Sequence, residues 1–100
     1  MSQSEIIEYA KSKGAEVRIR SFESAPNTET ICVNFGKIDS EETSGFDVWK
    51  HGIFIDELEG EWVIGFSQSA KTQPLEQMKL MQVLELWFAK PSDEVFKPYE

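Results

Sequence analysis

Alternating apolar and polar residues predict that the middle of the chain is a β-sheet. Val17 and Ile19 alternate with Arg18 and Arg20, as in a half-buried strand over 16–23. Residues 30–38 show the same period of two. Further on, the β-branched and aromatic stretches 46–58 and 62–67 flank Glu59-Gly60, which is typical of a hairpin with a tight turn.

The stretch 46–58 is long for one strand, because strands usually have about 5–6 residues. Gly52 leaves two alternatives. A bulge at Lys50-His51-Gly52, which we favour, gives a sheet of four strands. A full turn at the same place gives five.

Helical patterns flank the strands. Residues 4–13 form a short amphipathic stretch that ends at Gly14. Residues 75–90 form a longer helix with Pro74 in its first turn, and this helix is apolar nearly all round. Because one sheet face cannot cover it, we expect the tail 92–100 to fold back over it, which slightly favours a monomer over a homodimer.

The order helix, strands, helix, with short connections, predicts a single α+β domain over residues 1–100. We expect two layers: an N-terminal helix, an antiparallel four- (or five-) stranded meander sheet, and a long C-terminal helix packed on the sheet.

The charge balance narrows the classes of partner. The chain has 18 acidic and 10 basic side chains, for a net charge of −8. Nucleic acids and anionic membranes attract basic proteins, so neither is expected to bind directly. A basic protein partner is favoured instead, because complementary fields speed association. The start of the chain does not resemble a signal peptide and no stretch is long and apolar enough to span a bilayer, so we expect a cytoplasmic protein.

The sequence offers little catalytic chemistry. A single cysteine, Cys32, excludes an internal disulfide and a site with several thiolates. His51 is the only histidine, and no metal-ligand spacing surrounds it. We therefore expect no cofactor, no metal and no enzymatic activity. A small enzyme or ligand-binding domain that uses His51 and Asp56 is an alternative.

The acidic residues gather at one end in either topology. Four strands bring the 23–29 and 56–61 turns together, whereas five strands bring the 39–45 loop beside the 56–61 turn. The candidate partner-binding residues are the acids of the loop and hairpin turn, with one tryptophan as an aromatic anchor: Asp39, Glu41, Glu42, Asp56, Glu57, Glu59, Glu61 and Trp49.

One part of the hairpin resembles a protein family. The run His51-Gly52-Ile53-Phe54-Ile55 through Leu58, followed by Trp62-Val63-Ile64, is similar to a strand–turn–Trp pattern in bacterial toxin immunity proteins. Where that family has an Asn-Pro-Gly type of turn, this chain has Glu59-Gly60-Glu61. The resemblance implies an inhibitor that neutralises a toxin domain, with a nuclease as the expected partner. The same charge also fits an alternative: a phage-encoded nucleic-acid mimic that inhibits a DNA-binding defence complex.

Overall fold

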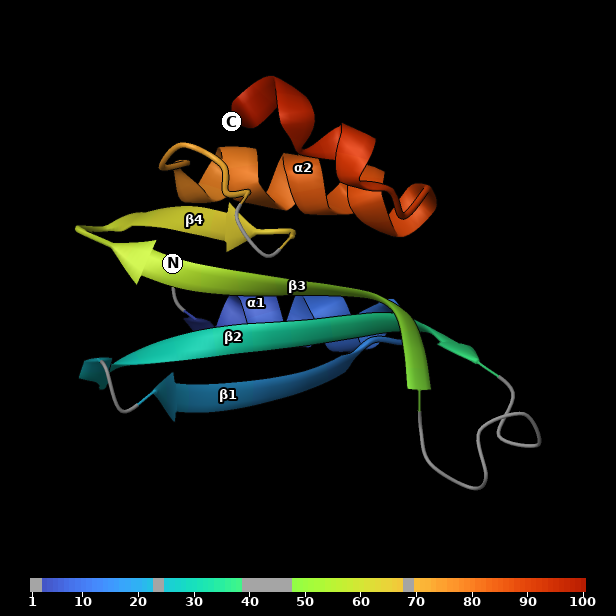
Figure 1. Cartoon of the computed structure of the whole chain (residues 1–100), viewed down its shortest axis with the longest axis horizontal. Coiled ribbons are helices and arrows are strands. Elements are labelled where there is room, and N and C mark those ends of the chain that lie inside the picture. Colours follow the sequence, from blue (N-terminus) through green and yellow to red (C-terminus); the bar gives the residue numbers. More distant parts are fainter. Residues whose placement is uncertain (1–2, 23–24, 39–47, 68–69) are drawn as a thin grey trace.

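The computed structural model describes residues 3–22, 25–38, 48–67 and 70–100. Its helices and strands follow the order α1 (Gln3–Ser12), β1 (Glu16–Phe22), β2 (Ala25–Ile38), β3 (Val48–Leu58), β4 (Glu61–Gly65) and α2 (Gln77–Ala89). Two short 3-10 helices, η2 (Asp93–Val95) and η3 (Lys97–Tyr99), end the chain. The strands form one antiparallel sheet in the order β1-β2-β3-β4 (Figure 1). The prediction of an α+β fold with an N-terminal helix, a meander sheet and a later helix is confirmed.

The favoured count of four strands is correct, but the bulge at Lys50-His51-Gly52 is not formed. β3 runs through Gly52, and the register Asn34↔Gly52 continues unchanged to Lys37↔Trp49. The unusual backbone lies on the neighbouring strand, where Gly36 has a φ of 76°. A Cβ at Gly36 would come within 3.2 Å of the His51 ring, so this glycine allows both the positive φ and the close approach.

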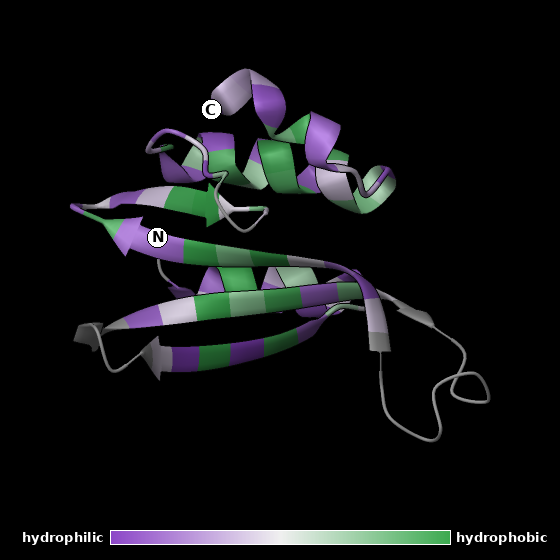
Figure 2. Ribbon diagram, in the orientation of Figure 1, coloured by the Kyte–Doolittle hydropathy of each residue, from purple (hydrophilic) through white to green (hydrophobic). Residues whose placement is uncertain are grey.

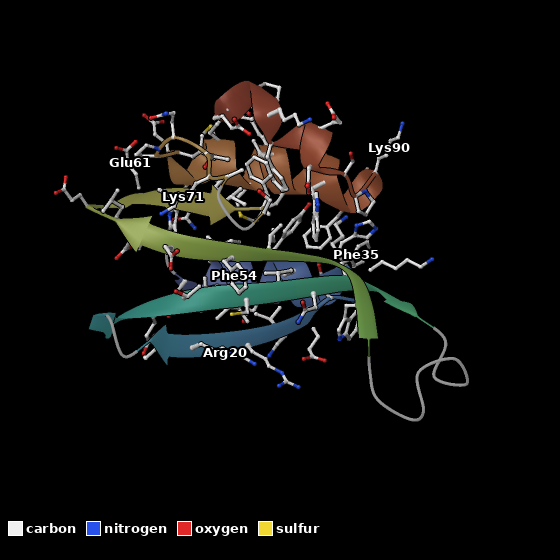
Figure 3. The ribbon with its side chains drawn as sticks, in the orientation of Figure 1. Arg20, Phe35, Phe54, Glu61, Lys71 and Lys90 are labelled. Atoms are coloured by element: carbon white, nitrogen blue, oxygen red, sulfur yellow. The ribbon has the colours of Figure 1, made fainter. Side chains whose placement is uncertain are left out.

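The sheet has two unlike faces. Val17 lies on the side of the helices and Arg18 and Arg20 on the other side, and Figure 2 shows this alternation as bands along β1. We call the second side the open face, because both helices, in the described part of the chain, pack on the first (Figure 1). Figure 3 is turned towards this face, with Phe54 near its middle. The open face includes Glu16, Arg18, Arg20, Thr30, Cys32, Asn34, Gly52, Phe54, Asp56, Leu58, Glu61, Val63 and Gly65.

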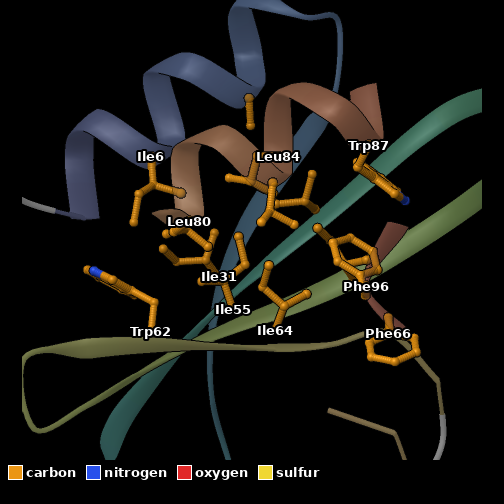
Figure 4. Close-up of a cluster of buried hydrophobic side chains, with 14 of the residues drawn as sticks. Ile6, Ile31, Ile55, Trp62, Ile64, Phe66, Leu80, Leu84, Trp87 and Phe96 are labelled. Carbon is orange, nitrogen blue, oxygen red and sulfur yellow. The ribbon is translucent and has the colours of Figure 1, made fainter. Parts of the chain in front are cut away.

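The core lies between the covered face and the helices. Ile31, Ile55 and Ile64 stand in one row across three strands and are fully buried. Ile6 of α1 and Leu80 of α2, with neighbouring side chains, close over them (Figure 4). Each such side chain stabilises the fold by about 1.5–3 kcal/mol through burial. The apolar positions of the alternating pattern therefore form the face of the sheet that the helices cover.

Aromatic rings extend this core towards the chain end. Trp87, 1% exposed, has ring contacts with Phe35, Phe88 and Phe96 at centroid distances of 5.9, 5.0 and 6.2 Å. Phe96 is fully buried and also contacts Phe66 at 5.3 Å. The prediction that the tail folds back over the later helix is confirmed.

The long C-terminal helix predicted over 75–90 is shorter in the structure. α2 begins at Gln77, so Pro74 lies before the helix and not in its first turn. Leu75 instead pairs with Trp62 through two backbone hydrogen bonds of 2.7 and 2.8 Å, and Thr72 N–H donates to the Ile64 carbonyl at 2.9 Å. This segment forms hydrogen bonds with the outer edge of β4, whose backbone groups would otherwise be unpaired. None of the helices in the described ranges is long and apolar enough to span a membrane.

Candidate functional site

The hairpin between β3 and β4 projects three carboxylates at one end of the sheet. Leu58 and Glu61 pair across a two-residue loop, Glu59-Gly60, in which both residues have positive φ, 52° and 85°. That backbone is typical of a type I′ hairpin turn. Glu57, Glu59 and Glu61 are all exposed, and we call these three residues the acidic tip.

The acidic tip is not neutralised within the described part of the chain. None of its three carboxylates forms a salt bridge with a described residue. More acids lie at the same end. Asp56 accepts a hydrogen bond from Thr30 beside it on β2, and Glu29 accepts one from Gln3 Nε2 at 3.3 Å. Such a one-sign cluster on exposed backbone creates a negative field that attracts a basic surface.

The backbone at Glu59 is unfavourable for its residue type. A non-glycine residue at positive φ costs about 1–2 kcal/mol, and asparagine and aspartate tolerate that conformation better than glutamate. Type I′ turns accordingly prefer Asn-Gly or Asp-Gly. Glutamate at this position lowers the stability of the turn. Such a local cost is typical of a residue that serves a function other than folding.

We expect Glu59→Asn to raise the free energy of unfolding by roughly 0.5–1 kcal/mol, because asparagine adopts positive φ with less strain. Urea denaturation followed by circular dichroism measures the change. Glu57→Asn is the matched control. It removes the same charge from a regular strand position, where asparagine is disfavoured, so it should not stabilise the protein. Equal effects of the two changes would mean that charge repulsion, and not backbone strain, sets the stability of the tip.

Of the other predicted binding residues, Asp56 lies beside the acidic tip, whereas Trp49 does not. Asp39, Glu41 and Glu42 lie outside the described residues, and the paired strand ends that flank them, Ile38 and Val48, lie at the end of the sheet opposite the hairpin turn. The described residues form a sheet of four strands, and not the five-stranded arrangement that would bring loop and turn together. Trp49 is also distant, since at a rise of about 3.3 Å per residue the strand from Trp49 to Leu58 spans roughly 30 Å.

His51 and Asp56 do not form a common site. His51 lies on the covered side of β3, where its ring contacts Trp87 at a centroid distance of 6.3 Å. Asp56 lies on the open face, because residues an odd number of positions apart in a strand point to opposite sides. Burial raises the pKa of the Cys32 thiol, so this cysteine stays protonated and acts as a small apolar side chain. Across the described ranges, no group of three or more His, Cys, Asp or Glu side chains is placed to hold a metal ion.

The open face carries a second feature that the sequence did not single out. A hollow of about 360 Å³ lies over β1, β2 and β3, and Arg18, Arg20, Trp49 and Phe54 are among the residues that line it. Alternation along β1 did place both arginines on one face. The sequence did not show, however, that no helix of the described residues covers this face.

No family model matches the chain, and no curated protein or solved structure shows a significant match to it. The function is therefore inferred from the chemistry of these two surfaces.

Proposed function

We propose that this protein is an acidic inhibitor that binds and neutralises a basic protein, in the manner of an immunity protein for a bacterial toxin. The observation that carries the proposal is the acidic tip: three exposed carboxylates, none of them in a salt bridge with a described residue, on a hairpin whose turn retains glutamate at positive φ. A nuclease is the toxin class that fits best, because its active site is built to attract phosphates and would accept carboxylates in their place.

The regular backbone of the hairpin suits this binding role. Ladder pairing from Phe54↔Gly65 to Leu58↔Glu61 extends to the turn itself, so the carboxylates are held on regular backbone. A backbone that is already ordered loses less freedom on binding, which favours affinity. Such a tip would enter a basic cleft without reorganising the sheet behind it.

We further propose that the protein acts in the cytoplasm as a monomer. In the described part of the chain β1 is a free edge of the sheet, and a free edge can pair with a second copy. Two antiparallel copies of β1 centred on Ile19 would set Arg18 of one opposite Arg20 of the other. Like charges placed directly opposite are unfavourable, which discourages this dimer.

The test of the proposed function is the triple change Glu57→Gln, Glu59→Gln and Glu61→Gln, with the partner isolated on the wild-type protein. We expect equal or slightly higher thermal stability, because exposed acids at a turn repel one another and contribute little to the fold. The association rate should fall about tenfold or more in ~10 mM salt, where screening is weak, and much less at ~500 mM. Stopped-flow fluorescence at several salt concentrations measures both values.

A matched control removes three charges elsewhere. Glu8, Glu85 and Glu94 are exposed on α1, α2 and η2, and their change to glutamine alters the net charge by the same amount. This control should associate nearly as fast as the wild type. Equal slowing by both triple variants would mean that only the overall charge matters, and unfolding of the tip variant would mean that the acids serve the fold.

A further inference from the structure

The hollow on the open face brings two basic side chains together on an acidic protein. Arg18 and Arg20 are the only arginines of the sequence, and both line it together with one acid, Glu16. Arg18 pairs through its Nε with Glu16 Oε1 at 2.6 Å, which compensates part of its charge within the hollow. Arg20 forms no salt bridge with a described residue. Guanidinium groups in this state bind carboxylates in a planar, two-bonded geometry.

Aromatic rings stand beside these guanidinium groups. Phe54 is 50% exposed although it lies in the middle of the sheet, and Trp49 is half-buried. Exposed aromatic rings next to arginine are the residue types that dominate binding energy in protein interfaces. A flat ring could stack on either side chain.

A missing side chain opens the floor of the hollow. Gly52 has an ordinary strand backbone, so its conformation does not require glycine. An ideal Cβ at this position, which lines the hollow, would lie 3.0 Å from Asn34 Oδ1, so a larger residue would both enter the hollow and crowd that side chain. The glycine therefore keeps the space free.

We propose that this hollow binds an acidic segment of a protein partner, in which a carboxylate pairs with Arg18 and Arg20 and an adjacent aromatic ring stacks on Phe54 or Trp49. A protein segment fits better than a small molecule, because it can also reach Leu58, which is 52% exposed on the same face beyond Asp56. An apolar centre with a charged rim is the usual anatomy of a protein interface. This inference is independent of the acidic tip, which attracts the opposite charge.

The experiment is a titration of the full ¹⁵N-labelled chain with the peptide Ac-Glu-Tyr-Glu-NH₂, followed by amide NMR shifts in ~150 mM salt. At this salt concentration the Debye length is about 8 Å, so the exposed charges of the acidic tip are largely screened. We expect saturable shifts at the amides of Arg20, Cys32 and Gly52. The neutral peptide Ac-Gln-Tyr-Gln-NH₂ should bind about tenfold more weakly, since it loses the charge-assisted hydrogen bonds.

Two variants test the site itself. Arg18→Gln with Arg20→Gln should weaken binding of the acidic peptide about tenfold or more, whereas Lys11→Gln on α1 with Lys90→Gln, directly after α2, should leave it unchanged. Gly52→Ala should also weaken it while both arginines remain, and the amide spectrum of each variant reports whether it is folded. Equal affinity for the neutral peptide, shifts confined to another surface, or no loss in the arginine variant would overturn the proposal. Binding of sodium benzoate at these amides without binding of the peptide would also overturn it, in favour of a small-molecule site.

Discussion

Deletion of Asp93–Glu100 is expected to lower the free energy of unfolding by about 3–5 kcal/mol and to cause self-association. Phe96 alone justifies this magnitude, because it is fully buried against Phe66 and Trp87, and loss of a buried phenylalanine side chain costs about 3–5 kcal/mol. The free energy of unfolding of a domain is about 5–15 kcal/mol in total, so a large fraction of this protein's stability depends on the tail. Urea denaturation and light scattering after size exclusion measure the two effects.

The substitution Phe96→Ala separates the buried ring from the rest of the tail. It should reproduce most of the loss of stability, whereas Lys97→Ala, an exposed neighbour, should change stability by less than about 0.5 kcal/mol. A truncated chain that remains a monomer of unchanged stability would contradict the role assigned to the tail.

Trp87→Ala is expected to have a similarly large effect, about 3–5 kcal/mol, because this ring lies at the centre of the aromatic cluster. It contacts rings from β2, β3 and the tail, so its removal leaves a cavity that no single element can fill. Loss of near-ultraviolet circular dichroism and a lower urea midpoint report the change.

Leu86 provides the matched control, since it precedes Trp87 on the same helix but is 56% exposed. Leu86→Ala should cost less than about 1 kcal/mol. A cost for Trp87→Ala that is as small as this would mean that the cluster does not organise the core.

The sheet could be predicted from the sequence because strand alternation and the hairpin turn are local signals. Val17 and Arg18 lie on the faces that their alternation indicates, and Glu59-Gly60 forms the expected tight turn. The start of α2 could not be predicted in this way. Pro74 and Leu75 fit the first turn of a helix, but the unpaired edge of β4 uses Leu75 as a strand partner, and that demand arises only after the sheet has formed.

The two candidate surfaces differ in the same way: the acidic tip could be predicted from the sequence, and the hollow could not. The three acids of the hairpin lie close together in the sequence, so the predicted turn was enough to place them at one tip. The hollow joins Arg18 on β1 to Trp49 and Phe54 on β3, and it depends on which face the helices leave uncovered. A bulge was expected at Lys50-His51-Gly52, but the unusual backbone in this part of the sheet is at Gly36, which has a positive φ, and a single sequence carries no direct signal for that difference.

The central proposal, that the acidic tip recognises a basic protein, is tested most directly by affinity capture from the native host with quantitative mass spectrometry. Three baits are compared: the wild-type chain, the variant with glutamine at 57, 59 and 61, and the control with glutamine at 8, 85 and 94. At low salt we expect one basic protein to be enriched on the wild-type and control baits and to fall about tenfold or more on the tip variant. Equal capture on all three baits, or a wild-type bait that enriches no basic protein, would contradict the proposal.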